Sequence, residues 1–117
     1  MSTLSTILAA ILGVVFVAAG LQKLSGQETV VANFKRWGYA DVVLKATGWV
    51  EVLAGTFLLT GIAIPALAVA GSLLVVPLMI GALATHQRAH DPIAMWAPPL
   101  VLLLLDLWLA YSLLPSG

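Results

Sequence analysis

The sequence contains no cysteine, and charged residues make up only 9% of its 117 positions. Without cysteine the chain forms no disulfide, thiolate metal site or dithiol relay, so any redox role requires a bound cofactor or substrate. The formal net charge is zero, which gives no support to a basic surface for nucleic acid. We therefore exclude nucleic acid as a partner. The scarcity of charge points instead to an apolar environment.

Long apolar runs dominate the chain, and 62% of its residues are hydrophobic. A membrane core about 30 Å thick needs about 20 apolar residues of helix, and the chain meets this requirement four times. A soluble bundle would need polar outer faces, whereas residues 7–19 and 101–105 are apolar all round. We predict an all-α integral membrane four-helix bundle, a single domain over 1–117 surrounded by the lipid bilayer. The spans are expected at about 4–24, 42–64, 66–86 and 93–114.

The connection between the first two spans is the only long one. Between Val30 and Trp37, apolar residues recur at three- and four-residue steps, opposite two basic residues. This pattern is typical of an amphipathic helix in the membrane interface, and we place it at about 28–37. A membrane-surface anchor is the simpler interpretation. A lid over a cavity on this side of the membrane is the alternative.

The basic residues are unevenly distributed among the connections. An even number of spans places the first and third connections on the same side of the membrane, and the second connection carries no basic residue. The positive-inside rule then assigns the first and third connections to the cytoplasm and both termini to the outside. The residues behind this assignment are Lys23, Lys35, Arg36, Lys45 and Arg88.

Glu51 is the first residue in a span that needs an explanation, because an unpaired carboxylate in a bilayer costs several kcal/mol. Gly48 and Gly55 share its stripe of the helix, so the carboxylate is expected to face the bundle. Lys23 and His86 end neighbouring spans on the same side of the membrane. These three side chains are predicted to converge. The cluster is interpreted either as a structural polar staple or as a pocket in which Glu51 and His86 transfer protons.

Asp106 is the second acidic residue inside a span, near the middle of the membrane. We count it with the polar cluster as a binding or structural residue. A bond to a hydroxyl group, from Thr56, Thr60 or Ser72, is the preferred explanation, and protonation is the alternative.

The candidate metal ligands are too few to predict a metal site. His90 and Asp91 are expected to be solvated loop residues. Together with His86 they do not supply the three or four converging ligands that a metal centre requires. We predict no metal.

Prolines are expected to disturb two spans. Pro77 lies inside the third span and frees the carbonyl of Leu73. Pro98 and Pro99 are predicted either to start the fourth helix or to break it just inside the interface.

Four segments together resemble the DoxX-like family of small bacterial membrane proteins. The resemblance spans nearly the whole chain and includes the four-span layout, which the family implies as its fold. Lys23, Glu51 and His86 fall on polar positions characteristic of that family. The matching segments are 20–24 (GLQKL), 34–39 (FKRWGY), 48–55 (GWVEVLAG) and 81–86 (GALATH).

The resemblance implies a location in the bacterial inner (plasma) membrane and a redox-associated accessory or assembly component of a membrane complex. One alternative is a membrane oxidoreductase that binds a quinone, or another lipid-soluble substrate, with the Lys, Glu and His cluster. A proton-coupled small-molecule transporter is the other. No covalent cofactor is expected. Whether the protein is an enzyme stays open, as does the choice between a membrane-protein partner and a homo-oligomer.

Overall fold

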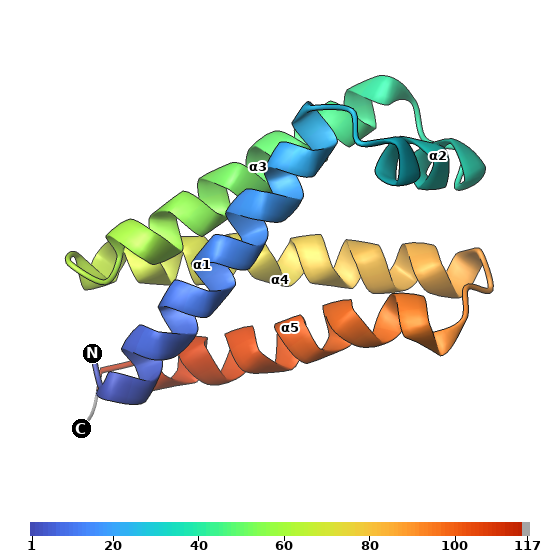
Figure 1. Cartoon of the computed structure of the whole chain (residues 1–117). Helices are drawn as coiled ribbons and strands as arrows, with labels where there is room; N and C mark the ends of the chain where they lie inside the picture. Colours follow the sequence, from blue (N-terminus) through green and yellow to red (C-terminus); the bar gives the residue numbers. More distant parts are fainter. Residues whose placement is uncertain (116–117) are drawn as a thin grey trace.

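The structure is a computed structural model that describes residues 1–115, and within them the chain forms five helices and no strand (Figure 1). The predicted all-α class is confirmed, and four of the helices are long and apolar enough to cross a membrane. The last two residues of the predicted domain, 116–117, lie outside the described residues. The helices are α1 Thr3–Leu24, α2 Glu28–Arg36, α3 Asp41–Thr60, α4 Pro65–Arg88 and α5 Ile93–Ser112.

Local sequence explains where these helices begin and end. The Ser2 hydroxyl accepts a hydrogen bond from the Ser5 N–H at 3.1 Å and caps the start of α1. α3 ends at Thr60 rather than near residue 64, because Gly61 begins a turn there. Pro65 then opens α4, where its fixed φ suits the first helical turn and its missing N–H costs nothing.

α1 and α3 are held together by a seam of glycines. A Cβ atom at Gly20 would lie 2.5 Å from the carbonyl oxygen of Gly48, and one at Gly55 would lie 2.6 Å from that of Gly13. The two backbones therefore approach more closely than any side chain would permit. Glu51 lies in this stripe of α3 and is buried, as the glycine spacing predicts.

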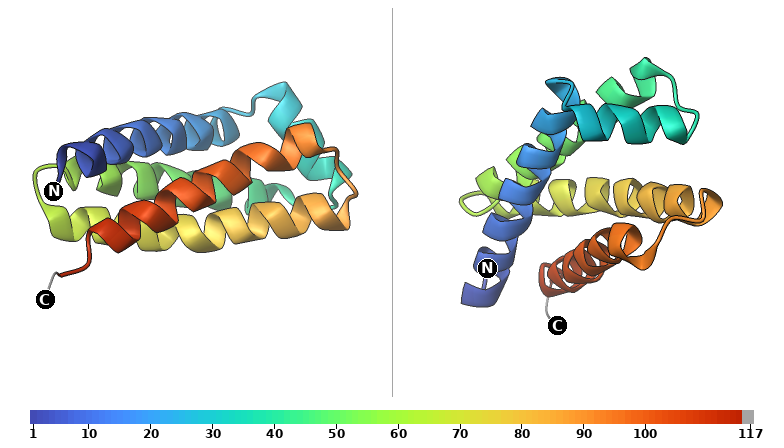
Figure 2. Two further views of the ribbon diagram at one scale, coloured as in Figure 1. Left: turned by 90° about the horizontal axis from the view of Figure 1, so that it is seen from below. Right: turned by 45° about the vertical axis from the view of Figure 1, so that its right-hand side comes forward.

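The other helices are added in order, α4 against α3 and α5 against α4 (Figure 1). α1 and α5 meet near the termini, where the hydroxyls of Ser5 and Ser112 are 2.9 Å apart. From that end the two helices separate toward α2 (Figure 1 and the right-hand view of Figure 2). The bundle is therefore closed at the end that holds the termini and wider at the end that holds α2.

The core is a narrow apolar column, and the outer faces are also apolar. Phe16, Leu12, Leu58 and Leu109 are among the largest fully buried side chains. Many large hydrophobic side chains point outward, as lipid-facing helices require. The molecule is 46 Å long, close to the thickness of about 40–45 Å of a bilayer with its headgroups.

Prolines lie inside two helices. α4 continues through Pro77. Pro98 and Pro99 neither start nor break the last helix, contrary to the prediction, because α5 begins at Ile93 and is helical through both of them. Each proline removes one backbone N–H, so a carbonyl four residues earlier is left without its usual helical partner.

Candidate functional site

An ion pair joins α1 to α3 at the wide end of the bundle. The Glu51 carboxylate oxygen Oε1 lies 2.7 Å from the Lys23 ammonium nitrogen. The Glu51 side chain is 5% exposed and the Lys23 side chain 16%. The close approach of Gly20 to Gly48 brings the two helices near enough for this contact. The pairing compensates a buried carboxylate that would otherwise be strongly unfavourable in the membrane.

The end of α4 folds Asp91 back onto His86. His90 adopts the left-handed conformation with φ of 56°, and the Asp91 N–H donates to the His86 carbonyl at 3.0 Å. This is the hydrogen bond of a Schellman turn, in which a residue with positive φ reverses the chain at a helix end. The turn also brings an Asp91 carboxylate oxygen within 2.7 Å of His86 Nδ1.

Asp91 is the centre of a hydrogen-bond network, and the prediction that it is a solvated loop residue is wrong. Its side chain is only 4% exposed. Arg36 donates to it at 2.6 Å through Nη1, and the Trp37 indole N–H donates at 3.1 Å. The Arg36 guanidinium, followed by the bond from His86, holds the pKa of this carboxyl well below its usual range. Asp91 is therefore a carboxylate that connects α2 to the end of α4.

Two further contacts fix α2 and the segment after it over α4. The Tyr39 hydroxyl lies 2.7 Å from the Thr85 hydroxyl, and this bond is the main cause of a lowered pKa for the Tyr39 phenol. Arg88 donates to the Trp37 carbonyl at 3.2 Å. Its guanidinium also lies 5.0 Å from the centre of the Tyr39 ring. Cation–π attraction therefore adds to the hydrogen bonds at this contact.

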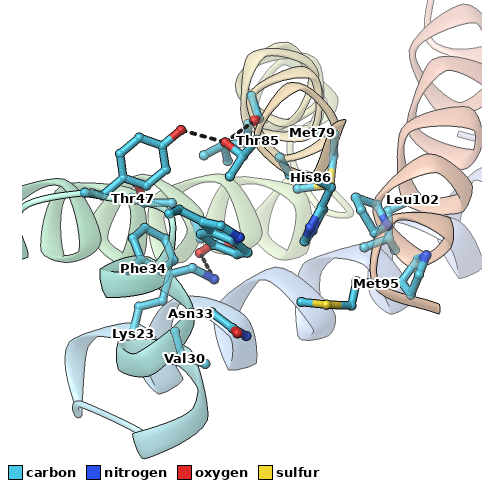
Figure 3. Close-up of a pocket in the computed structure, with 18 of the residues that line it drawn as sticks. Lys23, Val30, Asn33, Phe34, Thr47, Met79, Thr85, His86, Met95 and Leu102 are labelled. Atoms are coloured by element: carbon cyan, nitrogen blue, oxygen red, sulfur yellow. Dashed lines mark hydrogen bonds and ion pairs between the residues drawn. The ribbon is translucent and has the colours of Figure 1, made fainter. Parts of the chain in front are cut away.

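These contacts surround a cleft of about 510 Å³ beneath α2. One wall carries the Lys23–Glu51 pair, and α4 supplies His86 (Figure 3). Apolar side chains from α2, α4 and α5 make up most of the remaining surface. They include Val30, Phe34, Met79, Pro98, Pro99 and Leu102.

Comparison with known proteins identifies the family. A sequence model described as the DoxX-like family matches residues 7–109. The chain belongs to the DoxX-like family. No curated protein and no solved structure matches the chain. The family match indicates that the chain is a DoxX-type multi-pass membrane protein, in agreement with the four apolar helices.

The cleft of this DoxX-like protein brings together three of the four predicted cluster residues. Lys23 and Glu51 are in direct contact. His86 lines the same cleft but is bonded to Asp91 rather than to Glu51. The predicted convergence is thus a shared cavity, with one ion pair and one histidine held separately in it.

Asp106 lies elsewhere in the bundle. Its side chain is fully buried on α5, with Ser72 of α4 as its polar neighbour. Neither Asp106 oxygen has a hydrogen-bond partner among the described residues, and the Ser72 hydroxyl has none either. Neither Asp106 nor Ser72 lines the cleft, whose last residue on α5 is Leu102, four positions before Asp106.

The alternative hydroxyl partners for Asp106 are engaged or turned outward. The Thr60 hydroxyl donates to the carbonyl of Thr56 at 2.8 Å, and both threonines are exposed.

Among residues 1–115, no three His, Cys, Asp or Glu side chains are grouped as metal ligands.

Sequence reasoning missed Asp91, Arg36 and Trp37 as site residues. The signal available for Asp91 was its position five residues after His86 and directly before Pro92, at the end of a span. Arg36 and Asp91 are 55 positions apart, and no sequence period relates two such residues.

Proposed function

We propose that this DoxX-like protein binds a lipid-soluble molecule with a compact, oxygen-bearing head in the cleft beneath α2. A quinone is the ligand class that resemblance to the family suggests. In the cell, the protein would serve a redox-associated membrane complex as an accessory or assembly component. The observation that carries the proposal is the composition of the cleft, which combines apolar walls with an ion pair and an oriented histidine.

The cleft has the size and chemistry of a small-molecule site. Binding pockets typically enclose about 300–1,000 Å³ and place a few polar groups on a mostly apolar surface. Here the volume is about 510 Å³. Lys23 offers N–H donors for a carbonyl oxygen, and the aromatic and aliphatic side chains suit a ring or an alkyl chain.

The position of the cleft suits a ligand that arrives from the bilayer. All five basic residues lie at the wide end of the bundle, on α1, α2, α3 and α4. By the positive-inside rule this end is expected to face the cytoplasm. A lipid-soluble ligand would then place its head near the cytoplasmic interface and its tail among the helices.

Gly81 offers a direct test, because it lines the cleft and a Cβ there would meet no atom within 4 Å. A Gly81→Leu change should fill the cleft without disturbing the helices. We expect it to weaken binding of a short-chain alkylquinone by at least about tenfold, because the leucine side chain would occupy space in which the ligand contacts the protein. Binding is measured in detergent by quenching of tryptophan fluorescence.

Ala84→Leu is the matched control, because Ala84 lies on the same helix and is exposed on the outer surface. It should bind the alkylquinone as the wild type does, and both variants should unfold at wild-type temperature. Equal binding by wild type and Gly81→Leu would place any quinone outside the cleft. Failure of the wild type to bind would remove the quinone class altogether.

The accessory role has a separate readout. Native mass spectra of the protein released gently from its own membranes should contain a protein partner in fixed stoichiometry. Spectra with only the isolated chain, with or without small molecules, would contradict membership of a complex. The transport hypothesis gains no specific support, because Asp106 is not among the residues that line the cleft.

A further inference from the structure

Asp91 determines which nitrogen of His86 carries a proton. An ionised carboxylate has only acceptor atoms, and the Arg36 guanidinium keeps the pKa of Asp91 well below its usual range. The His86 Nδ1 atom, 2.7 Å from the carboxylate, must therefore be the donor. The neutral imidazole of His86 is held as the Nδ1–H tautomer, because the other tautomer would set two lone pairs against each other.

In this neutral form the remaining ring nitrogen, Nε2, is an acceptor. No side chain or carbonyl of residues 1–115 forms a hydrogen bond with it. His86 projects from α4 into the cleft, toward Met95 of α5 (Figure 3). The Trp37 ring system and the imidazole pack in a T-shaped arrangement, with ring centres 5.2 Å apart and planes at 85°. The ring is therefore fixed in orientation as well as in tautomer.

We propose that Asp91 is a positioning residue that presents His86 Nε2 to the cleft as a hydrogen-bond acceptor, and that the preferred ligand carries a hydroxyl group there. The ligand class is a lipid-soluble phenol, such as the reduced, hydroxyl-bearing form of a quinone. This inference rests on the proposed function, since it names the head group of the same ligand. A head with carbonyl oxygens alone gives Nε2 nothing to accept.

Glu51 is the competing acceptor in the cleft. Its Oε1 atom is buried against Lys23, and its position on α3 is independent of Asp91. Any hydroxyl preference due to Glu51 would therefore survive changes at Asp91 and His86. This independence allows the two acceptors to be separated by mutation.

The experiment compares a para-alkylphenol with its methyl ether, which differ in a single donor proton. Dissociation constants are measured in one detergent for wild type and variants, so differences in partitioning cancel when preferences are compared. The ratio of the dissociation constants, ether over phenol, should be about tenfold larger in the wild type than in His86→Phe. Tenfold in affinity corresponds to one hydrogen bond in an apolar site. Asp91→Asn should lose most of the same preference, because its amide group can donate to Nδ1 and allow the Nε2–H tautomer.

Arg36→Gln is the matched control, because it breaks the same link to α2 but leaves Asp91 bonded to His86. It should keep the phenol preference even if both probes bind more weakly. Nitrogen-15 NMR of the two histidines, His86 and His90, gives an independent readout of the tautomer. The wild type and Arg36→Gln should show Nδ1–H at His86, and Asp91→Asn should show Nε2–H.

Several results would overturn the inference. An Nε2–H signal for His86 in the wild type would do so, as would a phenol preference unchanged in His86→Phe. Loss of preference in Glu51→Gln alone would assign the acceptor to Glu51, and equal loss in Arg36→Gln and Asp91→Asn would assign the effect to α2. If neither probe bound the wild type while the tautomer signals were as expected, the proposed binding function would fail and the orientation of His86 would stand.

Discussion

Asp91 links the end of α2 to the end of α4. It accepts hydrogen bonds from Arg36, the last residue of α2, from Trp37, the residue after it, and from His86 on α4. It owes this position to His90, whose positive φ turns the chain back toward α4. Non-glycine residues seldom adopt this conformation. Gly26 and Gly38 take the equivalent left-handed positions after α1 and α2.

The Lys23–Glu51 pair is a second residue-scale feature, and its contribution can be measured. Lys23→Met leaves the Glu51 carboxylate buried without its cation, which should lower the free energy of unfolding by about 3 kcal/mol. The double variant Lys23→Met, Glu51→Gln removes both charges and should recover most of that loss. The measurement is unfolding of the purified protein in mixed detergent micelles. If the double variant were as unstable as the sum of the single variants, the two side chains would not be coupled.

At the scale of helices, α2 covers the cleft as well as being an interfacial segment. The amphipathic pattern of this segment favours a membrane-surface anchor, with a lid over a cavity as the alternative. Val30 and Phe34 line the cleft, and Phe34 is buried. Asp91 then ties the end of the helix to the α4–α5 connection. Part of the apolar face of α2, which predicts membrane binding, therefore points into the cleft of the protein itself.

This attachment predicts the local stability of α2. Arg36→Ala removes the 2.6 Å bond to Asp91 and should increase hydrogen exchange of the α2 amides by about tenfold, because one charge-assisted bond holding the helix is lost. Lys35→Ala is the control, since Lys35 is exposed on the same turn. Hydrogen exchange with mass spectrometry provides the measurement. Equal exchange in the two variants would show that the ion pair does not hold α2.

At the scale of the whole molecule, the α1–α3 seam leaves little room for larger side chains. A Cβ at Gly48 would meet the Gly20 carbonyl oxygen and the Lys23 Cβ at 3.0 Å each. Gly48→Val should therefore force the two helices apart and destabilise the bundle by several kcal/mol, as overpacking does in cores. Thermal unfolding in detergent checks this expectation, with Gly81→Leu as the comparison. A Gly48→Val protein as stable as the wild type would mean that the seam relaxes freely.

The sequence predicts the spans and the seam because lipid imposes simple rules. A fixed thickness sets the length of each helix, and close helix packing requires small residues at regular spacing, as at Gly48 and Gly55. The roles of Asp91 and Arg36 could not be predicted in this way. They depend on one unusual backbone angle at His90 and on the position of the short helix α2 relative to α4. The sequence also left three hydroxyl groups as candidate partners of Asp106, those of Thr56, Thr60 and Ser72, because the rotation of a helix about its axis is not encoded in any one residue. In the structure its polar neighbour is Ser72.

The glycine seam also sets an order on biosynthesis. α1 is made first, yet the helix that fits its glycine face, α3, is made only after the surface segment α2. α1 is therefore without its packing partner until α3 has been made. The α1–α3 pair can then form, and α4 packs against it. The cleft is completed last, when the connection that carries Asp91 and the first turns of α5 have been made. A nascent chain that ends after α3 contains the complete seam but not the cleft.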